Sequence, residues 1–228
     1  MKGIAVMKKS SPMKIGTIWL VLLILLAVLS LTAIAIGSAD YTVPEIISAL
    51  FRGDNRTIKV IVFNLRLLRL ILAILIGASL SASGAMMQAV MRNPLADPGT
   101  IGVSAGAGTA ATAILLLFPH LSASVPVFAF GGASLTCFLI YVLAWKGGVD
   151  PVRIILSGVA INSVLNGFNS LLQLIYSDDL EGILAFMNGS LSGKSWEQVQ
   201  TMAVYAAIGL ILALMCIRSA NALQLGEE

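Results

Sequence analysis

Two glycine-rich segments of the chain have residue types that bind phosphates in other proteins. Residues 188–195 (NGSLSGKS) depart from the phosphate-loop pattern G-x-x-x-x-G-K-[ST] only at the first position, and residues 106–111 (GAGTAA) fit the loose dinucleotide pattern G-x-G-x-x-A. Both patterns need a preceding strand, and the dinucleotide pattern also needs an acidic residue about 20 positions later. Residues 188–195 instead lie between two apolar segments, and residues 106–111 meet neither requirement. We therefore predict that this chain binds no nucleotide by itself.

Side chains that could hold a metal ion or attack a substrate are sparse. His120 is the single histidine, and it has no second ligand beside it in the sequence. Cys137 and Cys216 fall in apolar segments, where cysteine behaves as a small apolar residue. No apolar segment contains a pair of carboxylates, and there is no H-E-x-x-H motif. The sequence therefore predicts no enzymatic activity, no metal site and no cofactor.

A row of carboxamides is the most unusual polar pattern. Asn162, Asn166, Asn169 and Gln173 follow steps of four, three and four in an otherwise apolar segment, so a helix places them on one face. Carboxamides that face lipid are costly, which leaves contact with other helices or with water. Both remain open, and four in register favour the wall of a polar pathway.

Two further stripes repeat this spacing with small residues. Close backbone approach through such residues is what holds helices together in lipid. The stripes are Gly77, Ser81, Gly84 and Gln88 in one segment, and Gly102, Gly106, Thr109 and Ala113 in the next. We expect both to be helix-packing faces, and we add Gln88 to the candidate pathway residues.

The elements that position these side chains are membrane spans. Hydrophobic residues make up 58% of the chain and charged residues 11%, with a mean hydropathy of +0.95, which excludes an ordinary soluble domain. A span needs about 20 apolar residues. We therefore predict an all-α fold, a polytopic transmembrane helix bundle that forms a single domain over residues 1–228. The expected spans are residues 15–39, 70–91, 98–118, 124–145, 154–177 and 198–217.

A double proline hairpin should join the second and third spans. Asn93-Pro94 and Asp97-Pro98 break the helix twice, because a residue before proline is pushed out of the helical region, and Gly99 and Thr100 should start the next helix. The larger share of lysines and arginines falls on the side of the termini, which predicts that both termini are cytoplasmic. The first span also fits a cleaved signal peptide, although its apolar part is longer than usual.

The same hairpin segment carries a family resemblance. Residues 88–108 (QAVMRNPLADPGTIGVSAGAG) resemble the signature of the permease subunits of ABC importers for iron siderophores, haem and cobalamin, the FecCD-type family. Residues 64–88, 186–196 (FMNGSLSGKSW) and 221–228 (NALQLGEE) resemble further segments of that family in the same order. The resemblance covers essentially the whole chain beyond the first span.

The resemblance implies a fold and a set of partners. The family fold has about ten spans, of which this chain holds about six. A second permease copy or a paralogue completes a dimer around a central pathway. Cytoplasmic ATP-binding subunits would lie beneath the dimer, and an extracytoplasmic substrate-binding protein would lie above it. The dimer would lie in the bacterial cell membrane, in contact with the lipid bilayer. No nucleic acid partner is implied.

The implied function is import of an iron-siderophore complex. The alternatives are cobalamin or haem import, an ion-coupled carrier independent of ATPases, and a purely structural membrane component. A carrier would normally need a buried carboxylate in a span, and the expected spans contain no Asp or Glu.

The resemblance also assigns residues. The carboxamide row would line the pathway, and Arg66 and Arg69 in the first outer loop would dock the binding protein, although Leu68 stands where the family usually has proline. The ATPase coupling residues would be Leu223, Leu225, Gly226, Glu227 and Glu228. Because the chain stops inside this segment, we expect it to be a fragment, a truncated product or one part of a split permease.

Overall fold

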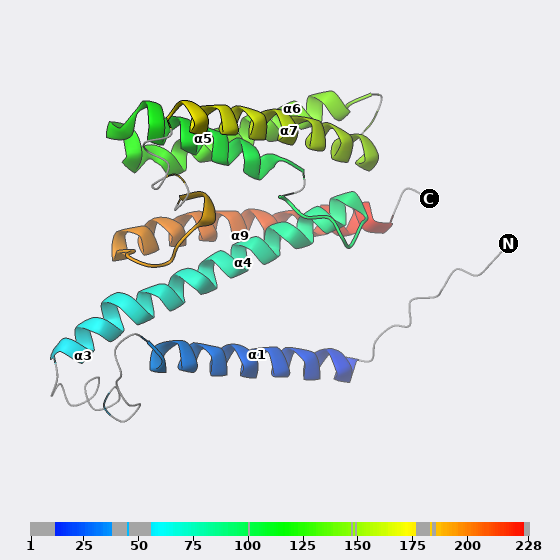
Figure 1. Ribbon diagram of the computed structural model, residues 1–228. Helices are drawn as coiled ribbons and strands as arrows, with labels where there is room; N and C mark the ends of the chain where they lie inside the picture. The colour runs from blue at the N-terminus through cyan, green and yellow to red at the C-terminus, as the bar shows by residue number, and fades with distance from the viewer. Residues whose placement is uncertain are drawn as a thin grey trace. The chain divides into compact units, whose positions relative to one another are not determined.

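The computed structural model describes residues 12–37, 45, 56–99, 101–146, 148, 150–176, 183 and 186–225. All regular elements in these ranges are helices (Figure 1), which confirms the all-α prediction. The longer helices are α1 (Pro12–Ala35), α4 (Leu67–Met91), α5 (Val103–Leu117), α6 (Val125–Ala144), α7 (Pro151–Ile175) and α9 (Trp196–Leu225). The shorter ones are α3 (Arg56–Ile61), the π-helical segment η1 (Val62–Arg66) and the 3-10 segment η2 (Pro119–Ser124).

Within the described ranges, five helical stretches are long and apolar enough to cross a bilayer. They are Ile15–Ala35, Thr57–Met91, Pro119–Ala144, Pro151–Ile175 and Trp196–Ala222. This confirms a multi-pass helical architecture. The remaining apolar helix, Val103–Leu117, has 15 residues, or about 22 Å, against a bilayer core of about 30 Å. The third expected span, residues 98–118, is therefore shorter than predicted.

The reason for the short third span lies in the backbone before it. Gly102 adopts the left-handed conformation, with φ of 89°, and α5 begins at Val103. This conformation suits glycine because it has no Cβ. The prediction that Gly99 and Thr100 start the helix was wrong for Gly99, which lies in a turn, and Thr100 lies outside the described residues.

The second expected span begins earlier than predicted. Instead of starting at residue 70, the helical chain runs without a break through α3, η1 and α4. The expected span starts after Arg66 and Arg69, which the resemblance places in an outer loop. One face of this helical stretch is nevertheless buried, with Ile58, Val62 and Leu68 at most 4% exposed, whereas Val60, Phe63 and Leu65 are exposed. Packing of that one face extends the helix past the charges.

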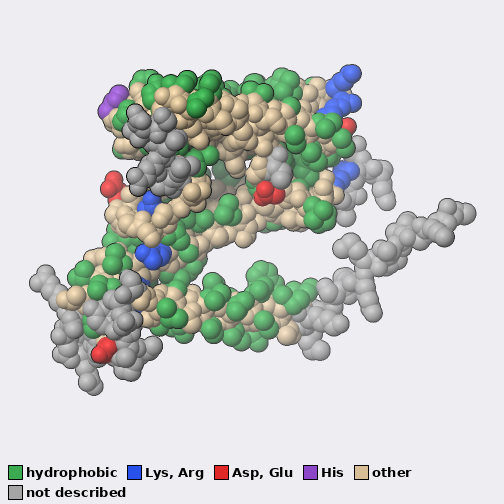
Figure 2. Space-filling model, viewed as in Figure 1, with side chains coloured by type: hydrophobic (Ala, Val, Ile, Leu, Met, Phe, Trp, Pro, Cys, Tyr) green, Lys and Arg blue, Asp and Glu red, His purple; other side chains and the backbone are tan. Residues whose placement is uncertain are grey.

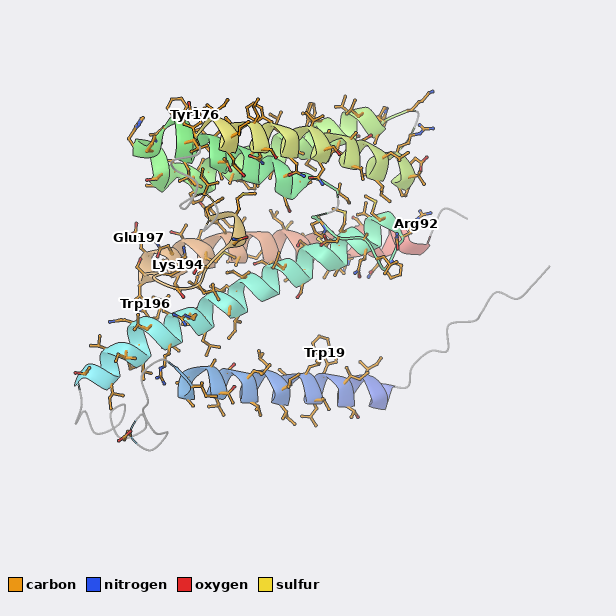
Figure 3. The ribbon with its side chains drawn as sticks, viewed as in Figure 1. Trp19, Arg92, Tyr176, Lys194, Trp196 and Glu197 are labelled. Atoms are coloured by element: carbon orange, nitrogen blue, oxygen red, sulfur yellow. The ribbon has the colours of Figure 1, made fainter. Side chains whose placement is uncertain are left out.

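The chain groups into two compact units, where the sequence led us to expect a single domain. The first consists of Met1–Ile74 and Leu191–Met202. It contains α1, α3, η1 and the beginnings of α4 and α9. Trp196 Nε1 donates a hydrogen bond to Asn64 Oδ1 at 3.2 Å, which joins the start of α9 to η1. Figure 3 shows Lys194, Trp196 and Glu197 together at this start of α9.

The second unit consists of Leu75–Ser190 and Ala203–Glu228. In it α5, α6 and α7 pack side by side, with α5 in contact with both of the others (Figure 1). One buried cluster, Ala111, Ile114 and Val125, joins α5 to the beginning of α6. Another, Leu116, Leu172 and Ile183, joins the end of α5 to the end of α7. α5 is thus the element around which this unit is built.

The helix surfaces fit a lipid environment. No residue of the most apolar stretch of α1 is buried, and Figure 2 shows hydrophobic side chains along the length of this helix. Leu31 is 69% exposed on α1, and Phe130 on α6 and Leu174 on α7 are about as exposed, at 76% and 75%. Exposed apolar surface on this scale is characteristic of helices that contact lipid or other spans.

Candidate functional site

The carboxamide row lies on α7 as the sequence predicted, but its members have different surroundings. Asn162 and Gln173 are half-buried, Asn166 is exposed and Asn169 is 4% exposed. Asn166 Nδ2 donates a hydrogen bond to Asn162 Oδ1 at 3.1 Å, a pairing one helical turn apart. The first two members therefore satisfy part of each other's polar groups.

Asn169 makes an interhelical contact instead. Its Nδ2 donates a hydrogen bond to Thr109 Oγ1 on α5 at 2.9 Å. Its Oδ1 is buried and has no hydrogen-bond partner in the described part of the chain. A buried acceptor of this kind costs about 1–3 kcal/mol. The structure therefore shows an interhelical bond at Asn169, and contact of the exposed Asn166 with a polar pathway stays a prediction.

Glycines allow α5 to approach its two neighbours closely. A Cβ on Gly106 would collide with Thr136 and would lie 2.7 Å from the Gly132 carbonyl oxygen on α6. Ile101 and Gly102, just before α5, approach Gly158 on α7 in the same way. A Cβ on Gly158 would lie 2.5 Å from the Ile101 carbonyl oxygen, and one on Gly102 would lie 2.9 Å from the Gly158 carbonyl oxygen. Backbone thus contacts backbone at both places, as expected for helices held together by small residues.

The small-residue stripe on α4, which contains Gly77 and Gly84, has no such contacts among the described residues. A Cβ added at Gly77 or Gly84 on α4 would meet nothing within 4 Å among the described residues. Gln88 on the same stripe is exposed, and its backbone carbonyl oxygen accepts a hydrogen bond from the Asn93 N–H at 3.2 Å. Packing of this face against another helix stays a prediction.

The double proline segment forms a turn between α4 and α5. α4 ends at Met91, and the side chains of Asn93 and Asp97 accept hydrogen bonds from the backbone N–H groups of Leu95 and Gly99 at 2.9 and 3.0 Å. Both are Asx turns, in which a side chain satisfies the backbone two residues on. Pro94 and Pro98 each follow one of these residues, so neither position can continue a helix.

The segment that resembled a phosphate loop has a different local structure. Gly189 and Gly193 have φ of 74° and 68°, and the residues before them form a short helical turn at 186–188 with no strand. At the start of α9, both the backbone N–H and the hydroxyl of Ser195 donate to Gln198 Oε1. The backbone N–H of Ser195, which would have to donate to a phosphate in a phosphate loop, is therefore already bonded to the Gln198 side chain.

A hydroxyl on α5 contacts this same segment. Thr112 is fully buried, and its Oγ1 lies 3.9 Å from Met187 Sδ. A Cβ on Gly108 would lie 3.6 Å from the Met187 sulfur and terminal methyl. The turn at residues 186–188 thus rests on α5 beside the Asn169 contact. The sequence had signalled neither Thr112 nor Met187, because a lone threonine or methionine in an apolar segment carries no periodic pattern.

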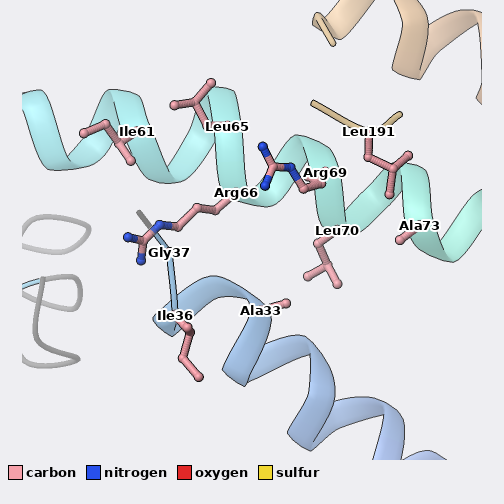
Figure 4. A pocket seen from close by; sticks show the side chains of 10 residues that line it. All are labelled: Ala33, Ile36, Gly37, Ile61, Leu65, Arg66, Arg69, Leu70, Ala73 and Leu191. Carbon is pink, nitrogen blue, oxygen red and sulfur yellow. The ribbon is translucent and has the colours of Figure 1, made fainter. Parts of the chain in front are cut away.

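Arg66 and Arg69 belong to the first unit, and their predicted place in an outer loop was wrong. Arg66 ends η1 and Arg69 lies in α4, because the helix continues past them. Together with α1 residues and Leu191 they line a cavity of about 280 Å³ (Figure 4). Arg66 is 8% exposed, and its Nη1 donates to the carbonyl oxygens of Ile34 and Ala35 at 2.7 and 2.9 Å, whereas Arg69 is exposed.

Two of the expected ATPase coupling residues lie in the last turn of α9. The helical backbone includes Leu223 and Leu225, whose side chains are outside the described part of the structure. Gly226, Glu227 and Glu228 lie outside the described residues altogether. Their role stays a prediction.

A model of the FecCD transport family matches residues 22–228 of this chain. Among curated relatives, the Fe(3+)-citrate import system permease protein YfmD of Bacillus subtilis (strain 168) is 36% identical over 195 residues, which cover 86% of this chain and 58% of the relative. The ferric enterobactin transport system permease protein FepG of Escherichia coli (strain K12) is 31% identical, with coverage of 84% and 58%. The cobalamin import system permease protein BtuC of Halobacterium salinarum (strain ATCC 700922 / JCM 11081 / NRC-1) is 36% identical, with coverage of 77% and 48%.

A solved structure shows the same architecture. A chain described as an inward-facing conformation of a metal-chelate type ABC transporter superposes with a TM-score of 0.75 at 26% identity, covering 92% of this chain and 65% of the other. The chain thus spans about three fifths of the length of the first curated relatives and of this structure.

Proposed function

Because this chain belongs to the FecCD transport family, we propose that it forms part of the translocation pathway of a binding-protein-dependent ABC importer. It is a multi-pass membrane protein, and we propose that both termini are cytoplasmic. ATP hydrolysis belongs to separate subunits. The cargo is a ferric chelate, most simply a siderophore or citrate complex, since relatives named for ferric citrate, hydroxamate and enterobactin transport are among the matches.

The observation that carries this proposal is the exposed amide pair on α7. Asn166 is exposed and half-buried Asn162 is bonded to it, in a helix that is otherwise apolar enough to cross a bilayer. A carboxamide facing hydrocarbon loses its hydrogen bonds to water, which costs several kcal/mol on transfer scales (about 4–8). Water, cargo or a second permease copy must therefore cover this face. A pathway that passes a chelate with many polar oxygens provides such an environment.

The mechanism that follows is alternating access. Binding of ATP to the partner subunits changes the relative stability of two arrangements of the helices, and the cargo can shift that equilibrium only by binding one of them more tightly. In this chain, α7 would move relative to α5, where Gly158 and Asn169 make their contacts. The C-terminal segment that begins at Leu223 would receive the motion from the ATP-binding subunit.

Co-purification tests the partner assignment. The chain is co-expressed with the ATP-binding subunit of its importer, solubilised in mild detergent and isolated by a tag on the chain's N-terminus. We expect the ATP-binding subunit to be retained, and deletion of residues 223–228 to abolish retention while the membrane yield of the chain is unchanged. Equal retention by the deleted form would contradict the coupling assignment.

Transport of a labelled panel tests the cargo. The importer is reconstituted in vesicles with its binding protein, and uptake of ferric citrate, a ferric hydroxamate, a ferric catecholate, haem and cobalamin is compared. We expect ATP-dependent uptake of a ferric chelate. Uptake of cobalamin or haem in its place would move the chain to the alternative within the same family, and uptake that persists without the ATP-binding subunit would favour a carrier.

A further inference from the structure

A groove in the second compact unit is lined almost entirely by apolar side chains. It has a volume of about 350 Å³, and no described residue around it carries a charge. Its walls come from the second half of α4, the start of α5, the second half of α6 and the start of α7. Met86, Met87 and Met91 line the α4 side. Methionine is flexible and polarizable, so this wall adapts to an occupant of irregular shape.

The groove has a buried floor and an exposed rim. The floor is a cluster of three buried residues, Met91, Ile101 and Ile140. The rim includes Val90, Cys137 and Tyr141, which are all exposed. Ser83 also lies on the rim, and its hydroxyl donates to the Leu80 carbonyl oxygen of the same helix at 3.0 Å. An apolar occupant can therefore enter the groove from the lipid without displacing that hydrogen bond.

The length of the groove matches one leaflet of a bilayer. Along α4 its lining residues run from Ser83 to Met91, which is about 12 Å at the helical rise per residue. Half of a bilayer core is about 15 Å. A spanning helix of another protein would need a contact face through the full core, whereas a lipid tail occupies a single leaflet. The groove therefore fits an acyl chain better than it fits a helix.

One end of the groove lies at the helix termini, where aromatic side chains mark a membrane surface. Tyr141 lines the groove, and its ring lies 5.4 Å from that of Trp145, the residue that follows α6. Tryptophan and tyrosine gather at the boundary between hydrocarbon and head groups. Ile154, another lining residue, directly follows Arg153 near the start of α7. A lipid tail in the groove would thus have its head group beside these termini.

Basic side chains frame this end of the groove. Figure 2 shows Lys and Arg side chains gathered where α6 ends and α7 begins in Figure 1. The Lys146 side chain forms no hydrogen bond or ion pair with another described residue. Arg153 donates to the Lys146 carbonyl oxygen and lies 3.6 Å from the Asp150 carboxylate, in an exposed pair of the weak kind. With Arg92 and Asp97 of the turn before α5, the framing segments carry three basic groups against two acidic ones. One positive charge is left for an anionic head group.

We propose that the groove holds an acyl chain of an anionic phospholipid whose phosphate is bound by Lys146 and Arg153. Basic residues next to membrane spans attract anionic lipids, and basic sites between spans bind their head groups. Arginine has five N–H donors, so its contact with Asp150 leaves others for the phosphate. In the proposed topology this lipid lies in the cytoplasmic leaflet. The site goes beyond the proposed import function and does not depend on the cargo.

Photo-cross-linking with lipids tests the site. The importer complex is reconstituted in phosphatidylcholine vesicles with a small fraction of a lipid that carries a diazirine in its acyl chain and either a phosphatidylglycerol or a phosphatidylcholine head group. After irradiation, mass spectrometry of peptides compares adducts on the groove segments, residues 83–91 and 137–154, with adducts on α1.

Matched variants separate the head group from the tail. K146Q and R153Q each remove one charge at the groove, and R218Q removes one charge from α9, which contributes no described residue to the groove. C137F fills the groove with an aromatic ring. C216F makes the same change at the other cysteine, which is exposed on α9.

We expect phosphatidylglycerol to label the groove segments several times more than phosphatidylcholine, and the two lipids to label α1 equally. K146Q and R153Q should each lower the preference at the groove about fivefold, because one basic group near an anionic lipid contributes about 1 kcal/mol. R218Q should leave it unchanged. C137F should lower labelling of residues 83–91 by both lipids severalfold, and C216F should not.

Two results would overturn the proposal. If both lipids label the groove equally, or if R218Q lowers the preference as much as K146Q does, the positive charge acts on the whole membrane surface and not at this site. If the groove segments carry no adduct while α1 does, another protein segment covers the groove. Circular dichroism checks that C137F keeps its helicity. The exposed substitution K146Q decides the outcome even if C137F does not fold.

Discussion

The close contact between α5 and α6 depends on the absence of a Cβ at one glycine of α6. Alanine substitutions at this glycine and at its neighbour in the sequence measure how much stability the close contact requires. Gly131 and Gly132 follow one another in α6. A Cβ on Gly132 would collide with the Gly106 carbonyl oxygen and lie 2.6 Å from Ala110 Cβ, whereas one on Gly131 would meet nothing within 4 Å. G132A and G131A therefore add the same methyl group to α6, but only the methyl group of G132A would meet atoms of α5.

The expected difference follows from two terms. Either substitution gains about 1 kcal/mol of helix propensity, since glycine is that much worse than alanine inside a helix. Only G132A must also separate α5 and α6 by about 1 Å, because carbon atoms pack at about 3.5–4.0 Å, and overpacking of this kind costs about 1–3 kcal/mol. The propensity gain cancels between the two variants. The overpacking cost remains, which is about a 5- to 150-fold difference in the folded-to-unfolded ratio.

Unfolding of the purified chain in mixed micelles measures this. The SDS fraction is raised while helicity is followed by circular dichroism, and the free energies of unfolding of the parent, G131A and G132A are compared. We expect G131A to be at least as stable as the parent and G132A to be the less stable variant by the stated amount. G106A should resemble G132A, because its Cβ would meet Thr136 and Gly132 on the other side of the same contact. Equal stability of G131A and G132A would refute the close approach of α5 and α6.

Three other outcomes are expected. T109V should lower the free energy of unfolding by about 1–3 kcal/mol, because it leaves the buried amide of Asn169 without its partner. N169A should lower the free energy of unfolding by less, because it also removes the unpaired Oδ1. The reverse order in the same unfolding assay would contradict this interpretation. D150A should cost about 1 kcal/mol, because the Asp150 carboxylate caps α7 by accepting from the Val152 N–H at 2.9 Å, and D150N should restore most of it. In intact membranes, N166C should react with a membrane-impermeant thiol reagent faster than V164C, since a two-residue step places Val164 on the opposite side of α7; faster labelling of V164C would place lipid, not water, at Asn166.

The helical fold could be predicted from the sequence because its signal is local. Long apolar segments and two Asx-Pro pairs mark where helices run and stop, and the structure breaks at those pairs. The errors arose where long-range contacts overrode local chemistry. The resemblance implied that Arg66 lies in an outer loop. Its charge is in fact satisfied by carbonyl groups of α1, some thirty residues earlier in the chain.

The candidate site was predictable in outline only. Periodicity placed the four amide residues on one face of α7, but it could not show which of them meets α5, because that depends on how two helices cross. Asn169 bonds to Thr109, 60 residues away, whereas the bond of the Asn166 side chain within the described part of the chain is to Asn162, one turn away on the same helix. The bond between Asn64 and Trp196, which are 132 residues apart, left no trace in either local sequence.

The contacts of α5 also indicate how motion of α7 would be transmitted in the proposed transport cycle. At the entrance to α5, Gly102 and Gly158 bring backbone against backbone, so α7 cannot slide there without carrying α5 with it. Farther along, Asn169 donates a hydrogen bond to Thr109, its own Oδ1 is unpaired among the described residues, and the buried Leu172 packs in one cluster with Leu116. Packed interfaces tend to switch between discrete arrangements. The glycine contact is therefore the natural pivot, and a second arrangement at the Asn169 end of α7 would have to replace both the bond to Thr109 and the packing of Leu172.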